Sequence, residues 1–176
     1  MENKVIVANG VNNSNPSASN GAVSETATSV ANQTVKTFAL SVKRVQTIET
    51  DESYVSVNLS FDKSIPGFVR DEDGSYVEAS VDHISFSRAS ITRQLCALND
   101  LIATYRDASE GAFNRKQLSI ILHGAKLTVK RTLHTAGEVI DGRDEPLERD
   151  QWFSEIVGVS VSKTAATLLL NALTLA

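Results

Sequence analysis

Apolar and polar positions alternate along much of the chain from residue 35 onward, a period of two that is typical of β-strands with one buried face. The clearest run is 55–61, in which every odd position is apolar and every even position is polar. Residues 38–42 alternate in the same way, and the phase then slips at Lys43-Arg44. The slip predicts a β-bulge, because one extra residue in a strand shifts all later side chains to the other face.

The next segment predicts a hairpin. Pro66-Gly67 is expected to end the preceding strand, and the polar turn at 71–74 would join short arms at 68–70 and 76–78. Residues 83–86 are expected to form a short third strand of the main sheet.

A helical period replaces the strand pattern over residues 88–109. Apolar residues recur there at spacings of four and three, which predicts one helix with a single buried stripe. Ser87 or Ser90 is expected to cap its N-terminus. The stripe consists of Ile91, Leu95, Leu98, Ile102 and Tyr105.

Residues 117–133 read as one long bent strand whose apolar phase changes faces at Gly124. A polar loop over 134–150 would follow, and then a last strand over 152–161. Ser162 is expected to cap a short C-terminal helix with several leucines.

These elements predict a mainly β protein with one central helix and a short C-terminal helix, an α+β arrangement. We expect an OB-like closed barrel, with the 88–109 helix covering one end, and a jelly roll is the alternative. Residues 1–33 are set apart, since they hold seven Asn, five Ser and no aromatic residue. They are expected to form a disordered or assembly arm, and 34–176 a single β-rich domain.

The composition and the absence of known motifs limit the classes of function that we expect. No stretch of 18 apolar residues exists, so we expect no membrane span and a cytoplasmic protein. Cys96 is the only cysteine, which excludes an internal disulfide. The sequence contains no phosphate-binding glycine loop, dinucleotide fingerprint, serine elbow or zinc signature. We therefore expect no enzymatic activity, no metal site and no cofactor.

Charge is distributed unevenly in this acidic chain, whose net charge is −4. Residues 111–135 carry five bases and no acid, whereas 51–82 hold eight acids against two bases. Lys126 and Lys130 share one face of their predicted strand. If that face adjoins the polar face that begins at Tyr54, the sheet presents a cationic surface with an aromatic edge. Cations that follow phosphates and aromatics that stack on bases are typical of sequence-tolerant binders of single-stranded nucleic acid. Solvated strand faces also commonly carry lysine and threonine, so the same pattern is compatible with an ordinary exposed face.

The sequence resembles phage-encoded single-stranded-DNA-binding proteins of the OB-fold type in the order of its elements. Three stretches add to the resemblance: Gly124-Ala-Lys-Leu-Thr-Val-Lys-Arg, Ala136-Gly-Glu and Glu148-Arg-Asp-Gln-Trp-Phe. The resemblance covers residues 35–161. It implies sequence-tolerant binding of single-stranded DNA or RNA in phage or mobile-element DNA replication or recombination, in a bacterial host cell. It also implies a binding surface on the first three strands and the loop before the last one. The candidate contacts are Lys43, Arg44, Tyr54, Lys126, Lys130, Arg131 and Trp152.

The two ends of the chain favour a second hypothesis. Bacterial single-strand binders usually end in an acidic tail, whereas this sequence ends in an apolar helical segment, and its low-complexity segment is at the other end. A virion or other assembly protein would use such an arm and helix for contacts between subunits. We expect a homo-oligomer in either case.

Overall fold

The computed structural model describes residues 28–30, 33–49, 55–109 and 111–175. The strands are β1 (Thr28–Val30), β2 (Gln33–Glu49), β3 (Val55–Arg70), β4 (Tyr76–Ser87), β5 (Lys126–His134) and β6 (Gln151–Ser160). The helices are α1 (Arg88–Leu98), α2 (Asp100–Asp107), α3 (Arg115–Ile121) and α4 (Lys163–Thr174). Most of the predicted arm lies outside the described residues, although β1 pairs with the start of β2. No helix in the described ranges is long and apolar enough to cross a membrane.

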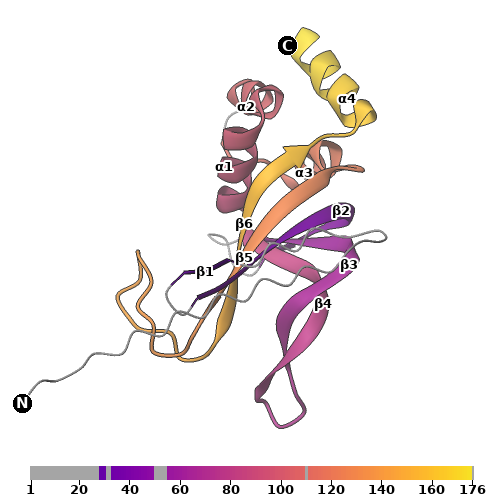
Figure 1. Ribbon diagram of the computed structural model, residues 1–176. Helices are drawn as coiled ribbons and strands as arrows, with labels where there is room; N and C mark the ends of the chain where they lie inside the picture. Colours follow the sequence, from indigo (N-terminus) through magenta and orange to yellow (C-terminus); the bar gives the residue numbers. More distant parts are fainter. Residues whose placement is uncertain (1–27, 31–32, 50–54, 110, 176) are drawn as a thin grey trace, which may run out of the picture.

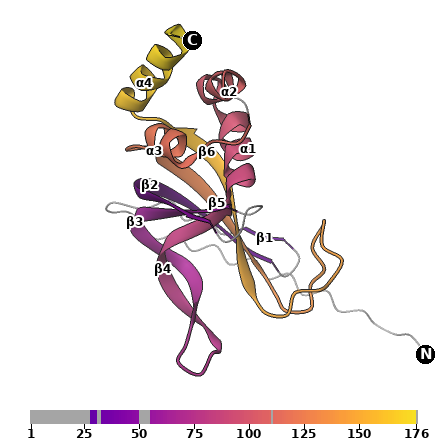
Figure 2. The same ribbon diagram turned by 180° about the vertical axis from the view of Figure 1, so that it is seen from behind.

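All strand pairs are antiparallel, and the sheet has the order β4-β3-β2-β5-β6, with β1 paired to β2. The long strand β2 pairs with β5 through residues 34–41 and with β3 through residues 42–49. The four helices gather at one end of the sheet, while the β3–β4 hairpin and the β5–β6 loop extend from the other (Figures 1 and 2). A mainly β fold with additional helices is therefore confirmed.

The closed barrel is not confirmed. Among the described residues β4 pairs only with β3 and β6 only with β5, so both remain edges of an open sheet. The jelly-roll alternative would need eight strands in two layers, whereas the described strands form one sheet.

Several local predictions are confirmed. The register of β2 against β3 shifts between Val42 and Arg44, as the bulge requires. The hairpin forms around residues 71–74, where Gly74 has a φ of 87°. Ser87 and Ser162 cap α1 and α4, each accepting a hydrogen bond from a backbone N–H three residues later.

Two predicted boundaries are wrong. Pro66-Gly67 does not end a strand, because β3 continues to Arg70 and pairs with β4 on both sides of a register shift. Gly67 is needed there, since a Cβ at this position would come within 2.7 Å of the Val81 side chain. The single helix over 88–109 is two helices, because Asn99 adopts an extended backbone and its side chain caps α2.

The prediction of one long strand over 117–133 is also wrong. Its first part is the helix α3, which begins at a capping box formed by Asn114 and Gln117. Leu118, Ile121 and Leu122 lie on one helical face and are buried. Gly124, with a φ of 64°, then turns the chain into β5, and L side chains rarely adopt this conformation.

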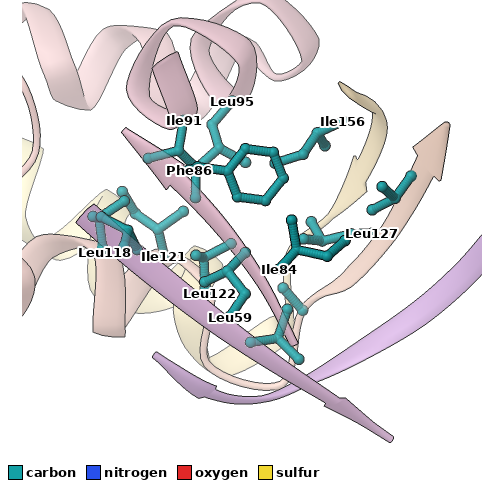
Figure 3. Packing of buried hydrophobic residues seen from close by; sticks show 14 of the residues in the cluster. Leu59, Ile84, Phe86, Ile91, Leu95, Leu118, Ile121, Leu122, Leu127 and Ile156 are labelled. Carbon is teal, nitrogen blue, oxygen red and sulfur yellow. The ribbon is translucent and has the colours of Figure 1, made fainter. Parts of the chain in front are cut away.

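The core lies between the concave face of the sheet and the helices (Figure 3). Strand residues such as Leu59, Ile84 and Leu127 meet Ile91 and Leu95 of α1 there. The predicted inward face of 55–61 is confirmed, since Val57, Leu59 and Phe61 are buried.

Candidate functional site

A groove of about 780 Å³ lies between the β4 and β6 sides of the open sheet. The lining residues come from β3, β4 and the start of α1, and from β5, β6 and the loop between them. Three arginines from two different elements, Arg131, Arg143 and Arg149, line it together with Trp152 and Phe153. None of the described residues that line the groove is acidic.

Arg131 lies on the inner face of the sheet. It follows Leu127 and Val129 of β5 and Ala125 just before the strand at alternate positions, and these three are buried in the core. Arg131 is itself only 6% exposed. Its Nη1 donates a hydrogen bond to the backbone oxygen of Pro66 in β3, which ties β5 to β3 across the concave face.

The same face continues onto β6. Ser154 is the register partner of Arg131, and Trp152 is the partner of Leu133. The Arg131 guanidinium carbon lies 5.6 Å from the centre of the Trp152 ring. Burial lowers the pKa of Arg131 to about 10, so the side chain is still charged at neutral pH but is held in an unfavourable environment.

Three buried polar atoms in this part of the groove have no hydrogen-bond partner among the described residues. They are Arg131 Nε, Trp152 Nε1 and Ser154 Oγ. Nearly all buried polar groups in native proteins are satisfied, and each exception costs free energy. Three such atoms close together are typical of a functional site, where a protein gives up some stability.

The two ends of the groove are bridged. At the helical end, Gln94 Oε1 of α1 accepts a hydrogen bond of 2.7 Å from the backbone N of Ile156 in β6. Backbone N–H groups alternate in direction along a strand, so those of Ser154 and Trp152 point to the same unpaired edge of β6 as that of Ile156. At the opposite end, the guanidinium carbon of Arg149 lies 3.5 Å from the Tyr76 ring centre, which joins the loop to β4.

The β5–β6 loop is held in place by hydrogen bonds at its base. Glu138 accepts from the side chain of Gln33, pairs with Nδ1 of His134 at 2.8 Å, and accepts from the backbone N of Thr135. The hydrogen bond with His134 is the main reason that the pKa of Glu138 is below its ordinary value. Leu147, which is buried, exchanges backbone hydrogen bonds with residues 137 and 138. This base positions Arg143 and Arg149 at the groove.

The structure separates the residues that the sequence predicted as contacts into two groups. Arg131 and Trp152 meet in the groove. Lys126 and Lys130 alternate with the buried residues of β5 and therefore lie on the opposite face of the sheet. Lys43 and Arg44 are exposed at the bulge in β2, and Tyr54 lies outside the described residues.

Folding brings acidic residues to the outer face of the sheet, which therefore is less basic than the acid-free stretch of sequence suggests. Lys130 pairs with Glu155 of the neighbouring strand at 3.7 Å. Asp62 accepts a hydrogen bond from the backbone N of Ser41, the register partner of Lys126, and this bond holds the pKa of Asp62 below its usual value. The carboxylate of Glu155 thus lies beside Lys130.

Arg143, Arg149 and Ser154 are groove residues that the sequence patterns did not reveal. The two arginines stand in a loop with many acids, such as Glu145 and Glu148, that do not line the groove. Arg131 carried a visible signal, because the alternation from Ala125 places a charged residue in the buried phase.

A second basic hollow is lined by Arg88, Arg115 and Lys116. Its lining also includes Thr47, Val55 and Asn114. No cluster of three or more potential metal ligands occurs in the described part of the chain.

Comparison with known proteins adds no family: the chain matches no family model, no curated protein and no solved structure. The groove itself is therefore the basis for assigning a function.

Proposed function

We propose that the protein binds single-stranded nucleic acid in the groove between β4 and β6, with little dependence on sequence. The observation that carries this proposal is the lining of the groove. The described residues that line it include three arginines and several aromatic rings but no carboxylate, although the protein is acidic overall. Arginine recognises phosphate, and aromatic rings stack on the unpaired bases that only single strands expose.

The net charge of −4 opposes binding of a polyanion over most of the surface. A groove that collects positive charge between low-dielectric walls can still attract phosphates locally. Arg143 and Arg149 belong to the loop and would contact the strand near the groove entrance, whereas Trp152 and Arg131 lie on the inner face of the sheet.

Fluorescence polarisation with labelled oligonucleotides tests the proposal. Single strands should bind more tightly than duplexes, and affinity should fall steeply with salt because each neutralised phosphate releases most of one counterion. The Arg143→Gln/Arg149→Gln variant should flatten the salt slope by roughly 1–2 units, given about 0.7 per contact on a single strand.

A matched control uses the outer face. Lys126→Gln/Lys130→Gln removes the same number of charges from the opposite side of the sheet, where the sequence predicted contacts. The groove proposal expects this variant to keep the salt slope of the unmodified protein. A loss confined to the lysine variant would move the interface to the outer face, and no binding by the unmodified protein at low salt would refute single-strand binding.

Exposed leucines on α4 favour assembly as a second candidate function. Leu168 and Leu170 are 46% and 54% exposed, and residues 164–176 contain no charged side chain. Such a helix is suited to contact another subunit, although a few leucines offer much less than the roughly 800 Å² per partner of a standard interface. Native mass spectrometry of the full chain and of Leu168→Gln/Leu170→Gln decides, since an oligomer built on α4 should dissociate in the variant.

A further inference from the structure

The inner part of the groove presents hydrogen-bond donors that the described chain does not satisfy. We infer that Arg131, Trp152 and Ser154 form a binding site for one phosphate group. This inference rests on the proposed function, because it assigns the site to a backbone phosphate of the bound strand.

The geometry brings the three side chains together. Arg131 and Ser154 face each other across β5 and β6, and Trp152 is two residues from Ser154 on the same face. The bond from Arg131 Nη1 to Pro66 fixes the guanidinium from the far side. With Nη1 occupied, Nε remains as a donor without a partner in the described chain, beside those of Trp152 and Ser154.

The chemistry of the donors selects an anion. The indole N–H and the guanidinium can only donate, and the serine hydroxyl can donate as well, so their common partner must be an acceptor. Phosphate oxygens are acceptors, and their charge also compensates a buried guanidinium that has no carboxylate partner among the described residues. Water would satisfy the hydrogen bonds but would leave the charge uncompensated.

The three atoms are covered in this conformation. A phosphate can reach them only if neighbouring side chains rotate, so occupation of the site must change the surroundings of the indole. Trp152 is the only tryptophan in the chain, and its fluorescence therefore reports on this site without a label.

The test titrates the full-length protein with inorganic phosphate at constant ionic strength, maintained with chloride. We expect a saturable change in Trp152 fluorescence, together with a rise in the thermal unfolding midpoint, because a ligand that binds only the folded state stabilises it. Arg131→Met should lower phosphate affinity at least about tenfold, and Ser154→Ala should lower it several-fold. Lys126→Met, a matched loss of one charge on the outer face, should leave the titration unchanged.

The thermal midpoint of Arg131→Met without phosphate separates a binding role from a structural one. Removing a buried charge that lacks a carboxylate partner in the described chain should offset the loss of the hydrogen bond to Pro66, so the midpoint should change little. If this variant fails to fold, the structural tie to Pro66 is what matters and the inference is overturned for Arg131, while Ser154→Ala still tests the site.

Two results would overturn the phosphate site itself: no fluorescence or thermal response to phosphate in the unmodified protein, or an unchanged response in both Arg131→Met and Ser154→Ala. If labelled single strands still bind in either case, the groove function stands without this site. If neither phosphate nor oligonucleotide binds, both proposals fail.

Discussion

The two ends of the concave face of the sheet belong to the same strands but carry different kinds of side chain. Near the helices, Leu127, Val129 and Ile156 face inward and are buried in the core. Farther along the same two strands, the inward positions are taken by Arg131, Ser154 and Trp152. The alternation of side chains continues through both ends, and only the kind of residue changes.

Under the proposed function, the contrast separates the part of the sheet that stabilises the fold from the part that binds. The apolar end consists of buried aliphatic side chains, and their burial contributes favourable hydrophobic free energy to folding. The polar end holds a buried cation and three polar atoms without partners in the described chain, and both features lower stability. Native proteins tend to break the rules of good packing at functional sites.

The greatest loss of stability should follow from a change at the apolar end. Leu127→Ala should lower the free energy of unfolding by roughly 2–5 kcal/mol, because it opens a cavity in a cluster of buried side chains. Urea unfolding followed by circular dichroism measures this loss. If Arg131→Met costs as much, the two ends do not differ and the polar end is structural.

An intermediate effect is expected on binding at the polar end. Trp152→Ala should weaken single-strand binding by about 1–3 kcal/mol without changing the salt slope, since stacking does not depend on counterions. Trp152→Phe keeps a ring but removes the Nε1–H, so it should recover most of the stacking energy. Equal affinity of both variants and the unmodified protein would exclude Trp152 from the interface.

A smaller effect is expected where the two ends meet. Gln94→Ala removes the acceptor for the backbone N of Ile156 and should cost about 1 kcal/mol of unfolding free energy. Gln94→Glu retains an acceptor oxygen and should cost less. Hydrogen exchange at Ile156 provides the direct measurement, and an unchanged rate in Gln94→Ala would contradict the bridge between α1 and β6.

Acid should have the mildest effect, confined to the base of the β5–β6 loop. The folded-state pKa of Glu138 lies below its ordinary value, so the contribution of this carboxylate is present above its unfolded-state pKa and is lost as pH falls through the folded-state pKa. Amide exchange at Thr135, corrected for the intrinsic pH dependence, should therefore show less protection in that acidic range. Glu138→Gln should show the weakened protection at neutral pH, and a loop that is equally protected in this variant would not depend on the carboxylate.

The strands could be predicted from the sequence because a period of two, sustained over seven residues, matches an extended chain and does not match a helix. The run 55–61 and the bulge after Val42 follow directly from it. The α3 segment could not be predicted in this way, because Leu118, Ile120 and Leu122 fit a strand while Leu118, Ile121 and Leu122 fit a helix. The capping box at Asn114 decides between them, and it consists of two polar residues outside the apolar pattern.

The groove was harder to predict than the strands. Arg131 and Trp152 were among the candidate contacts, but their meeting depends on the register of β5 with β6. Arg143 and Arg149 belong to a loop whose base is held by Glu138 and Leu147, through contacts that no periodicity records. The prominence of Lys126 and Lys130 came from an acid-free stretch of sequence, and folding brings Glu155 beside Lys130.

The unpaired edges of β4 and β6 also determine how a long polymer could enter and leave. In the described part of the chain, no strand pairing encircles the groove, which is bridged by side chains such as Gln94 and Arg149. A strand could thus be loaded sideways at any internal position, without threading a free end. Covalently closed circles of single-stranded DNA should therefore be bound as readily as linear molecules of the same length.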